Sequence, residues 1–197
     1  NIPDSFGQLR NLVQLQLPYN ELTGSLPSSI GEMESLLYLY LYSNALSGQI
    51  PPTIGNLKNL TFAWLNSNKF SGTIPSSLGN CSNIEYLLLN SNLLTGTLPS
   101  SVGDLSSAVE IQLSTNMLSG TIPPSLGELK LLASLILSDN YLTGIIPSSL
   151  GGAVRMTQLE ISRNSISGSI PLSLGNMEHL AFLEITSSFL TGSVPSS

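Results

Sequence analysis

The side chains that could act as a nucleophile or a general base are few and scattered. The sequence holds one cysteine, Cys81, and one histidine, His179, whereas a catalytic site needs several such groups converging on one point. Cys81 occupies a position that holds leucine in other segments, for example Leu57 and Leu105. We therefore expect a buried, unreactive thiol, and not a nucleophile or half of a disulfide. His179 lies where other segments have asparagine, and we expect a solvated imidazole. These residues predict no enzyme.

The charged residues argue against a metal, a cofactor or a nucleic acid. Neighbouring carboxylates such as Glu32 and Glu34 fit a solvated surface, and no spacing in the chain is typical of metal ligands. The formal net charge of −6 disfavours nucleic acid and anionic membrane surfaces as partners. No apolar run approaches the roughly 18 residues needed to span a bilayer. We expect no membrane contact within this segment.

The one covalent chemistry that the sequence favours is glycosylation. Acceptor sequons occur at Asn59-Leu60-Thr61 and Asn80-Cys81-Ser82, and we expect both Asn59 and Asn80 to be available, with Asn59 in the better context. Only 9% of residues are charged, against about 25% in an ordinary soluble domain. The surface must therefore consist largely of Ser, Thr, Asn and Gly, which suits an extracellular protein.

All of these residues are positioned by a strict internal repeat. Glycines recur with a step of 24 residues, and the prolines that follow them keep the same step from Pro3 to Pro195. The glycines are Gly24, Gly48, Gly72, Gly96, Gly120, Gly144, Gly168 and Gly192. A fixed period of this length indicates stacked repeats. We expect residues 1–197 to form one domain of about eight repeats.

One repeat reads as a short strand followed by a turn. Apolar residues alternate at Leu39 and Leu41 and at Leu87 and Leu89, as they do in a strand with one buried face. Such a strand is stable only beside others, so the repeats must pair their strands in parallel. We expect strands to begin near residues 13, 37, 61, 85, 109, 133, 157 and 181. The Ser-Ser-Leu-Gly run predicts a short 3₁₀ or α turn.

An asparagine follows each strand at the same position. The column comprises Asn20, Asn44, Asn68, Asn92, Asn116, Asn140 and Asn164. A buried amide offers two donors and an acceptor, so each can bond the backbones of its own repeat and the next one. Ser188 interrupts the column, and we expect looser packing there.

The pattern LxxLxLxxNxLxGxIPxxLGxL resembles the plant-type leucine-rich repeat of receptor-like kinases and polygalacturonase-inhibiting proteins. The resemblance implies an α/β solenoid: a right-handed horseshoe or superhelix with a parallel β-sheet on its concave side and short 3₁₀ or α turns on its convex side. It also implies extracellular recognition, at the cell surface or secreted, and a possible co-receptor. The paired-cysteine caps typical of the family are absent, so we expect an internal fragment without caps.

Outward-facing strand positions are not needed for stacking, so their identity carries information about binding. Aromatic residues gather there on three adjacent strands and acidic residues on later ones. The expected ligand-binding residues are Tyr38, Tyr40, Tyr42, Phe62, Trp64, Tyr86 and Leu88, with Glu110, Glu160 and Glu184. Exposed aromatic clusters mark interfaces, and the carboxylates favour a basic partner. The alternative is cross-strand aromatic pairing that only stabilises the sheet. We expect loss of the Trp64 ring to weaken binding much more than folding.

Three functions are compatible with these features. The first is part of a receptor ectodomain that binds a peptide or protein on the concave face. The second is a soluble secreted protein, such as an inhibitor of a pathogen cell-wall hydrolase, that uses the same face. The third is an ice-binding surface formed by the Ser/Thr column that runs from Thr23 to Thr191, which needs a flat hydroxyl face and no aromatic patch.

Overall fold

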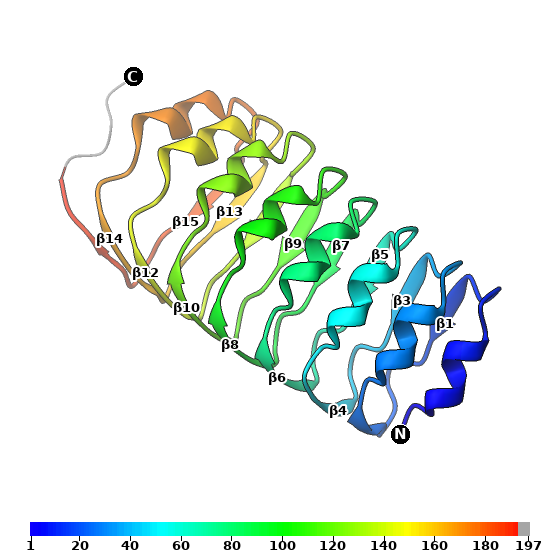
Figure 1. Ribbon diagram of the computed structural model, residues 1–197. Coiled ribbons are helices and arrows are strands. Elements are labelled where there is room, and N and C mark those ends of the chain that lie inside the picture. The colour runs from blue at the N-terminus through cyan, green and yellow to red at the C-terminus, as the bar shows by residue number, and fades with distance from the viewer. Residues whose placement is uncertain (193–197) are drawn as a thin grey trace.

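The protein is a solenoid of eight coils, each with two short strands and one 3₁₀ helix (Figure 1). The computed structural model describes residues 1–192; Pro195, expected in the proline column, lies outside the described residues. The first strands of the coils form one parallel sheet in the order β1-β3-β5-β7-β9-β11-β13-β15. Their bounds are Gln14–Gln16, Tyr38–Tyr40, Phe62–Trp64, Tyr86–Leu88, Glu110–Gln112, Ser134–Ile136, Gln158–Glu160 and Phe182–Glu184. Each begins one residue after its predicted start, so the predicted register is confirmed.

The second strands form another parallel sheet, in the order β16-β14-β12-β10-β8-β6-β4-β2. These strands are β2 (Thr23–Ser25), β4 (Ala45–Gly48), β6 (Lys69–Thr73), β8 (Leu93–Thr97), β10 (Met117–Thr121), β12 (Tyr141–Gly144), β14 (Ser165–Gly168) and β16 (Phe189–Leu190). The proline that follows has no N–H to give to a ladder, which keeps them short. The resemblance predicted the first sheet only; this second sheet supplies an additional face.

The convex side carries the eight 3₁₀ helices, as predicted (Figure 1). The first precedes β1, and each later one follows a second strand. They are η1 (Asp4–Gln8), η2 (Ser28–Glu32), η3 (Pro52–Asn56), η4 (Ser76–Asn80), η5 (Ser100–Asp104), η6 (Pro124–Glu128), η7 (Ser148–Gly152) and η8 (Leu172–Asn176). Consecutive helices pack closely: a Cβ added to Gly79 would collide with the backbone carbonyl of Ser101. Glycine is therefore required where one helix lies against the next.

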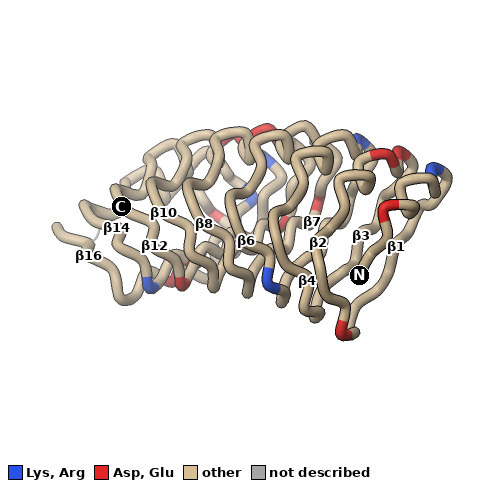
Figure 2. Tube along the Cα trace, turned by 60° about the horizontal axis from the view of Figure 1, so that its bottom comes forward, with Lys and Arg blue, Asp and Glu red and all other residues tan. Residues whose placement is uncertain are grey.

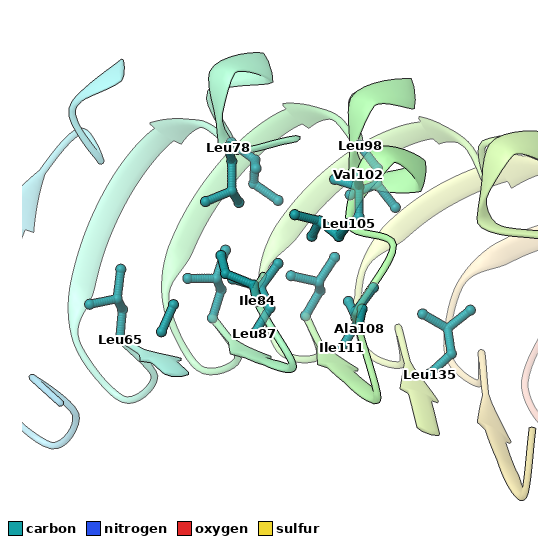
Figure 3. Packing of buried hydrophobic residues seen from close by; sticks show 14 of the residues in the cluster. Leu65, Leu78, Ile84, Leu87, Leu98, Val102, Leu105, Ala108, Ile111 and Leu135 are labelled. Carbon is teal, nitrogen blue, oxygen red and sulfur yellow. The ribbon is translucent and has the colours of Figure 1, made fainter. Parts of the chain in front are cut away.

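One continuous hydrophobic core fills the space between the sheets and the helices (Figure 3). Leu87, Ile111 and Leu135 enter it from successive first strands, and Leu78 and Val102 enter it from successive helices. All five are at most 1% exposed. Because each coil contributes the same set of side chains, the core continues from coil to coil without interruption.

The asparagine column forms a hydrogen-bonded ladder, and its direction corrects the sequence-based prediction. The Nδ2 group of Asn92 donates to the carbonyls of Leu65 (3.1 Å) and Leu89 (3.1 Å), and its Oδ1 accepts from the N–H of Phe70 (3.0 Å). Leu65 and Phe70 belong to the preceding coil, not to the next one. The same bonds recur at Asn44, Asn68, Asn116, Asn140 and Asn164.

The two ends of the column lack these inter-coil bonds. Asn20 donates only to Leu17 and Pro18 in its own coil. Ser188 donates only to Thr186, at 3.5 Å. Leu183 in the last coil is 44% exposed, but β15 is the edge strand of its sheet and no described coil covers it, which alone accounts for the exposure. The looser packing expected from Ser188 therefore stays a prediction.

We predict that Asn92→Ala lowers the free energy of unfolding by about 2–4 kcal/mol, because it removes partners from the buried N–H of Phe70 and the buried carbonyls of Leu65 and Leu89. Denaturant titration followed by circular dichroism measures the change. Asn20→Ala is the matched control and should cost much less, since its amide bonds no other coil. Equal losses for the two variants would show that the inter-coil bonds are not what stabilises the stack.

Candidate functional site: the aromatic face of the concave sheet

The aromatic side chains lie together because the strands pair in register. Tyr38 pairs with Phe62, and Phe62 with Tyr86. In the neighbouring column Tyr40 pairs with Trp64. Alternation along each strand turns these residues away from the core, while Leu39 and Leu87 point into it. We call Tyr38, Tyr40, Tyr42, Phe62, Trp64, Tyr86 and Leu88 the aromatic patch. All seven are half-buried.

The rings of the first column stack on one another. The ring centroids of Tyr38 and Phe62 are 5.2 Å apart, with an interplanar angle of 28°. Those of Phe62 and Tyr86 are 4.9 Å apart, with an angle of 6°. These are offset-stacked geometries of the kind that aromatic pairs prefer. The cross-strand pairing predicted as the alternative is thus present, and it stiffens the patch.

Trp64 is more enclosed than its outward position predicts. Its ring stacks on Tyr40 with centroids 4.5 Å apart, and it makes edge contacts with Tyr42 (5.9 Å) and Phe62 (6.0 Å). Its indole Nε1 is buried without a hydrogen-bond partner among the described residues. A truncation of Trp64 must therefore cost folding stability, which revises the expectation that this cost is small.

Two further features of the patch arise only in three dimensions. Tyr19, in the turn after β1, contacts Tyr42 edge to face with centroids 5.1 Å apart and is 77% exposed. Sequence reasoning missed it because it lies in a turn, outside the strand columns.

Partial burial, with Tyr38 and Tyr42 close by, raises the pKa of the Tyr40 phenol above its usual value. The hydroxyl of Tyr40 is therefore a neutral hydrogen-bonding group at physiological pH.

The carboxylates occupy the other half of the sheet. Glu110 lies on β9, Glu160 on β13 and Glu184 on β15, and only Glu110 adjoins the aromatic patch, as the register partner of Tyr86. Figure 2 shows how sparsely charge is distributed along the chain. Among residues 1–192, the only carboxylates within ion-pair distance of a cation are Glu32 and Asp139. The three glutamates therefore present uncompensated negative charge.

The groups with catalytic potential lie apart from this face. Cys81 is fully buried and its thiol donates to the carbonyl of Ile54 (3.2 Å); burial raises its pKa to about 11. This confirms the prediction that the thiol is buried. His179 is exposed. Within the described residues there is no cluster of three or more potential metal ligands, and no helix with the length and hydropathy of a membrane span.

Both predicted glycosylation sites lie on the surface. Asn59 is exposed, and its Nδ2 donates to the carbonyl of Glu34 (3.0 Å). Asn80, at the end of η4, is exposed too. Their modification stays a prediction.

Comparison with known proteins identifies the repeat. The family model described as Leucine Rich Repeat matches residues 11–33, 35–57, 59–81, 83–105, 131–153 and 155–177, which together exceed half of the chain. Comparison with curated proteins gives no match.

Solved structures of plant receptors are similar to the chain over nearly its whole length. One is the ectodomain of the receptor kinase GASSHO1/SCHENGEN3 from Arabidopsis thaliana in complex with CASPARIAN STRIP INTEGRITY FACTOR 2 (TM-score 0.97, 36% identity, 98% of this chain and 23% of that chain). Another is the Arabidopsis receptor kinase HAESA with the peptide hormone IDA and the co-receptor SERK1 (TM-score 0.94, 36% identity, 98% and 33%). The chain thus spans a quarter to a third of these ectodomains. A plant ice-binding protein is also similar (TM-score 0.74, 28% identity, 99% and 70%).

Proposed function

Because the chain belongs to the leucine-rich repeat family, we propose that it is part of the extracellular ectodomain of a plant receptor and binds a peptide or protein ligand on its concave sheet. The observation that carries the proposal is the aromatic patch. Its rings stand on strand positions that the core does not use, and they remain half-exposed. Half-exposed aromatic clusters are the usual anchors of protein interfaces.

The dimensions of the sheet suit an extended ligand. Eight strands about 4.8 Å apart span on the order of 35 Å, which is the length of an extended peptide of roughly ten residues. A ligand that runs across the strands would meet the aromatic patch first and the carboxylates of β9, β13 and β15 afterwards. We expect the aromatic half to supply most of the buried area and the acidic half to select the charge of the ligand.

The solved neighbours support this role. GASSHO1/SCHENGEN3 was solved with CASPARIAN STRIP INTEGRITY FACTOR 2, and HAESA with a peptide hormone and a co-receptor. We assign this chain the same kind of partner, a recognition role without catalysis, and an extracellular location. The location fits the low charge content and the exposed asparagines of both sequons.

A second candidate function is ice binding by the sheet of second strands. Thr73, Thr97 and Thr121 lie at equivalent exposed positions of three successive coils, and the methyl group of Thr97 packs over Gly120 of the next coil. Such packing fixes the side chains in a regular array of methyl and hydroxyl groups. The similarity to a plant ice-binding protein favours this candidate. The two flanking coils carry Gln49 and Ile145 at the position equivalent to Thr73, Thr97 and Thr121, so this array is short.

The receptor proposal predicts that Trp64→Ala weakens ligand binding by about 2 kcal/mol or more, as loss of a central aromatic anchor does. Linear peptides selected from a displayed random library on the 197-residue chain supply the ligand, and calorimetry gives the Kd. Leu172→Ala, an exposed apolar residue of η8 on the convex side, is the control and should leave the Kd unchanged.

The same Trp64→Ala protein must also be unfolded in denaturant, because the ring contacts its neighbours. We expect a stability loss of about 1–2 kcal/mol, smaller than the loss of binding. An unchanged Kd together with a large loss of stability would identify Trp64 as a sheet-stabilising residue and place the ligand elsewhere.

The ice-binding candidate predicts that the chain shapes growing ice crystals and that Thr97→Arg abolishes the effect by disrupting the centre of the array. Trp64→Ala, on the other sheet, should have no influence. Nanolitre osmometry with crystal imaging measures both. Ordinary disc-shaped crystals with the unmodified chain would eliminate this candidate.

A further inference from the structure

We propose that the junction between Tyr86 and Glu110 is a cation subsite, which takes a lysine or arginine side chain of the ligand. The inference rests on the proposed function, because the ligand must lie on the concave sheet to reach it. It names one chemical group of the ligand and the two side chains that hold it.

The first element of the subsite is the ring of Tyr86, the last of the stacked column. Phe62 has a stacked ring on each side, Tyr38 and Tyr86. Tyr86 lies nearly parallel to Phe62 and, within the described part of the chain, stacks on no other ring. The stacked aromatic column thus ends at Tyr86, and the next residue of the column, on β9, is Glu110. The electron-rich face of an aromatic ring attracts a cation.

The second element is the carboxylate of Glu110. Glu110 is the register partner of Tyr86, so its backbone lies about 4.8 Å away on the next strand. The side chain of Gln112 donates to Glu110 Oε1, which holds the carboxylate on the concave face. No lysine, arginine or histidine of residues 1–192 lies within ion-pair distance of it. Both Tyr86 and Glu110 are half-buried, which limits solvent screening of a bound charge.

These two elements favour the same kind of group. A cation is attracted by the ring face and by the carboxylate, a neutral apolar side chain gains only the ring, and an acidic one is repelled. Arginine suits the junction best, because its planar guanidinium can lie on the ring while its N–H groups bond the carboxylate. Glu160 does not combine a carboxylate with a neighbouring aromatic ring, since its register partners are Ile136 and Glu184.

The subsite also fixes a spacing in the ligand. Strand β9 lies two strands beyond β5, which carries Trp64, and two strand spacings amount to about 10 Å. An extended peptide covers that distance in about three residues. Peptides selected on the chain should therefore carry a basic residue about three positions from the residue that contacts Trp64.

The test compares three tripeptide probes, acetyl-Ala-Arg-Ala-amide and its norleucine and glutamate analogues, titrated into the chain and followed by NMR shifts of β7 and β9. We expect the arginine probe to bind at least about fivefold more tightly than the norleucine probe, which corresponds to about 1 kcal/mol. Glu110→Gln should remove this preference and leave norleucine binding unchanged. Glu160→Gln, the matched control, should preserve it.

Tyr86 is tested with two variants that separate the ring from the hydroxyl. Tyr86→Phe keeps the ring face and should retain the arginine preference, whereas Tyr86→Leu should reduce it severalfold. Thermal melting of each variant verifies that it is folded, and the Phe variant preserves the stack if the Leu variant does not fold.

Two results would overturn the subsite. One is an arginine probe that gives no saturable shifts on β7 and β9. The other is an equal loss of arginine binding in Glu110→Gln and Glu160→Gln, which would assign the attraction to the overall negative potential. If Trp64→Ala still weakens the binding of library-selected peptides in either case, the proposed function stands and only the subsite fails. If Trp64→Ala leaves their Kd unchanged, both proposals fail.

Discussion

From the second coil to the seventh, an asparagine amide bonds each coil to the preceding one. The amide joins backbone groups of two coils that would otherwise be buried without partners, and it requires the coils to be of equal length. The constant step of 24 residues is therefore a physical requirement of the stack. An inserted residue would move the amide away from the carbonyl and the N–H that it serves in the coil before it.

The candidate site depends on the same constraint. Because equal coils place equivalent residues on adjacent strands, an aromatic side chain repeated at one position becomes a column of stacked rings. The stacking stabilises the sheet and also holds the rings in fixed orientations, so little conformational entropy remains to be lost when a ligand binds. Sheet stabilisation and the proposed ligand recognition thus both follow from one arrangement. The stacked column ends at Tyr86, next to the uncompensated carboxylate of Glu110 on the neighbouring strand.

Periodicity predicts most of this fold, because a repeat specifies its strands, turns and core columns many times over. It places all eight strands of the concave sheet within one residue and identifies Cys81 as buried. It does not reveal contacts that depend on how one coil lies against another. The direction of the asparagine ladder, toward the preceding coil, depends on such contacts. The residue before each ladder asparagine also has a positive φ, as at Ser67 (φ 55°) and Arg163 (φ 51°), although none of these residues is glycine. The enclosure of Trp64 and the contact of Tyr19 with Tyr42 depend on ring orientations that spacing does not specify.

The most direct test of the account uses the single tryptophan of the chain, Trp64, which lies within the aromatic patch. A library-selected peptide that lacks tryptophan is titrated into the unmodified chain while Trp64 emission and its quenching by acrylamide are recorded, with calorimetry on the same samples. If the ligand lies on the concave aromatic strands, quenching decreases and the emission shifts along a saturation curve with the calorimetric Kd. Saturable binding by calorimetry with unchanged emission and quenching of Trp64 would contradict it.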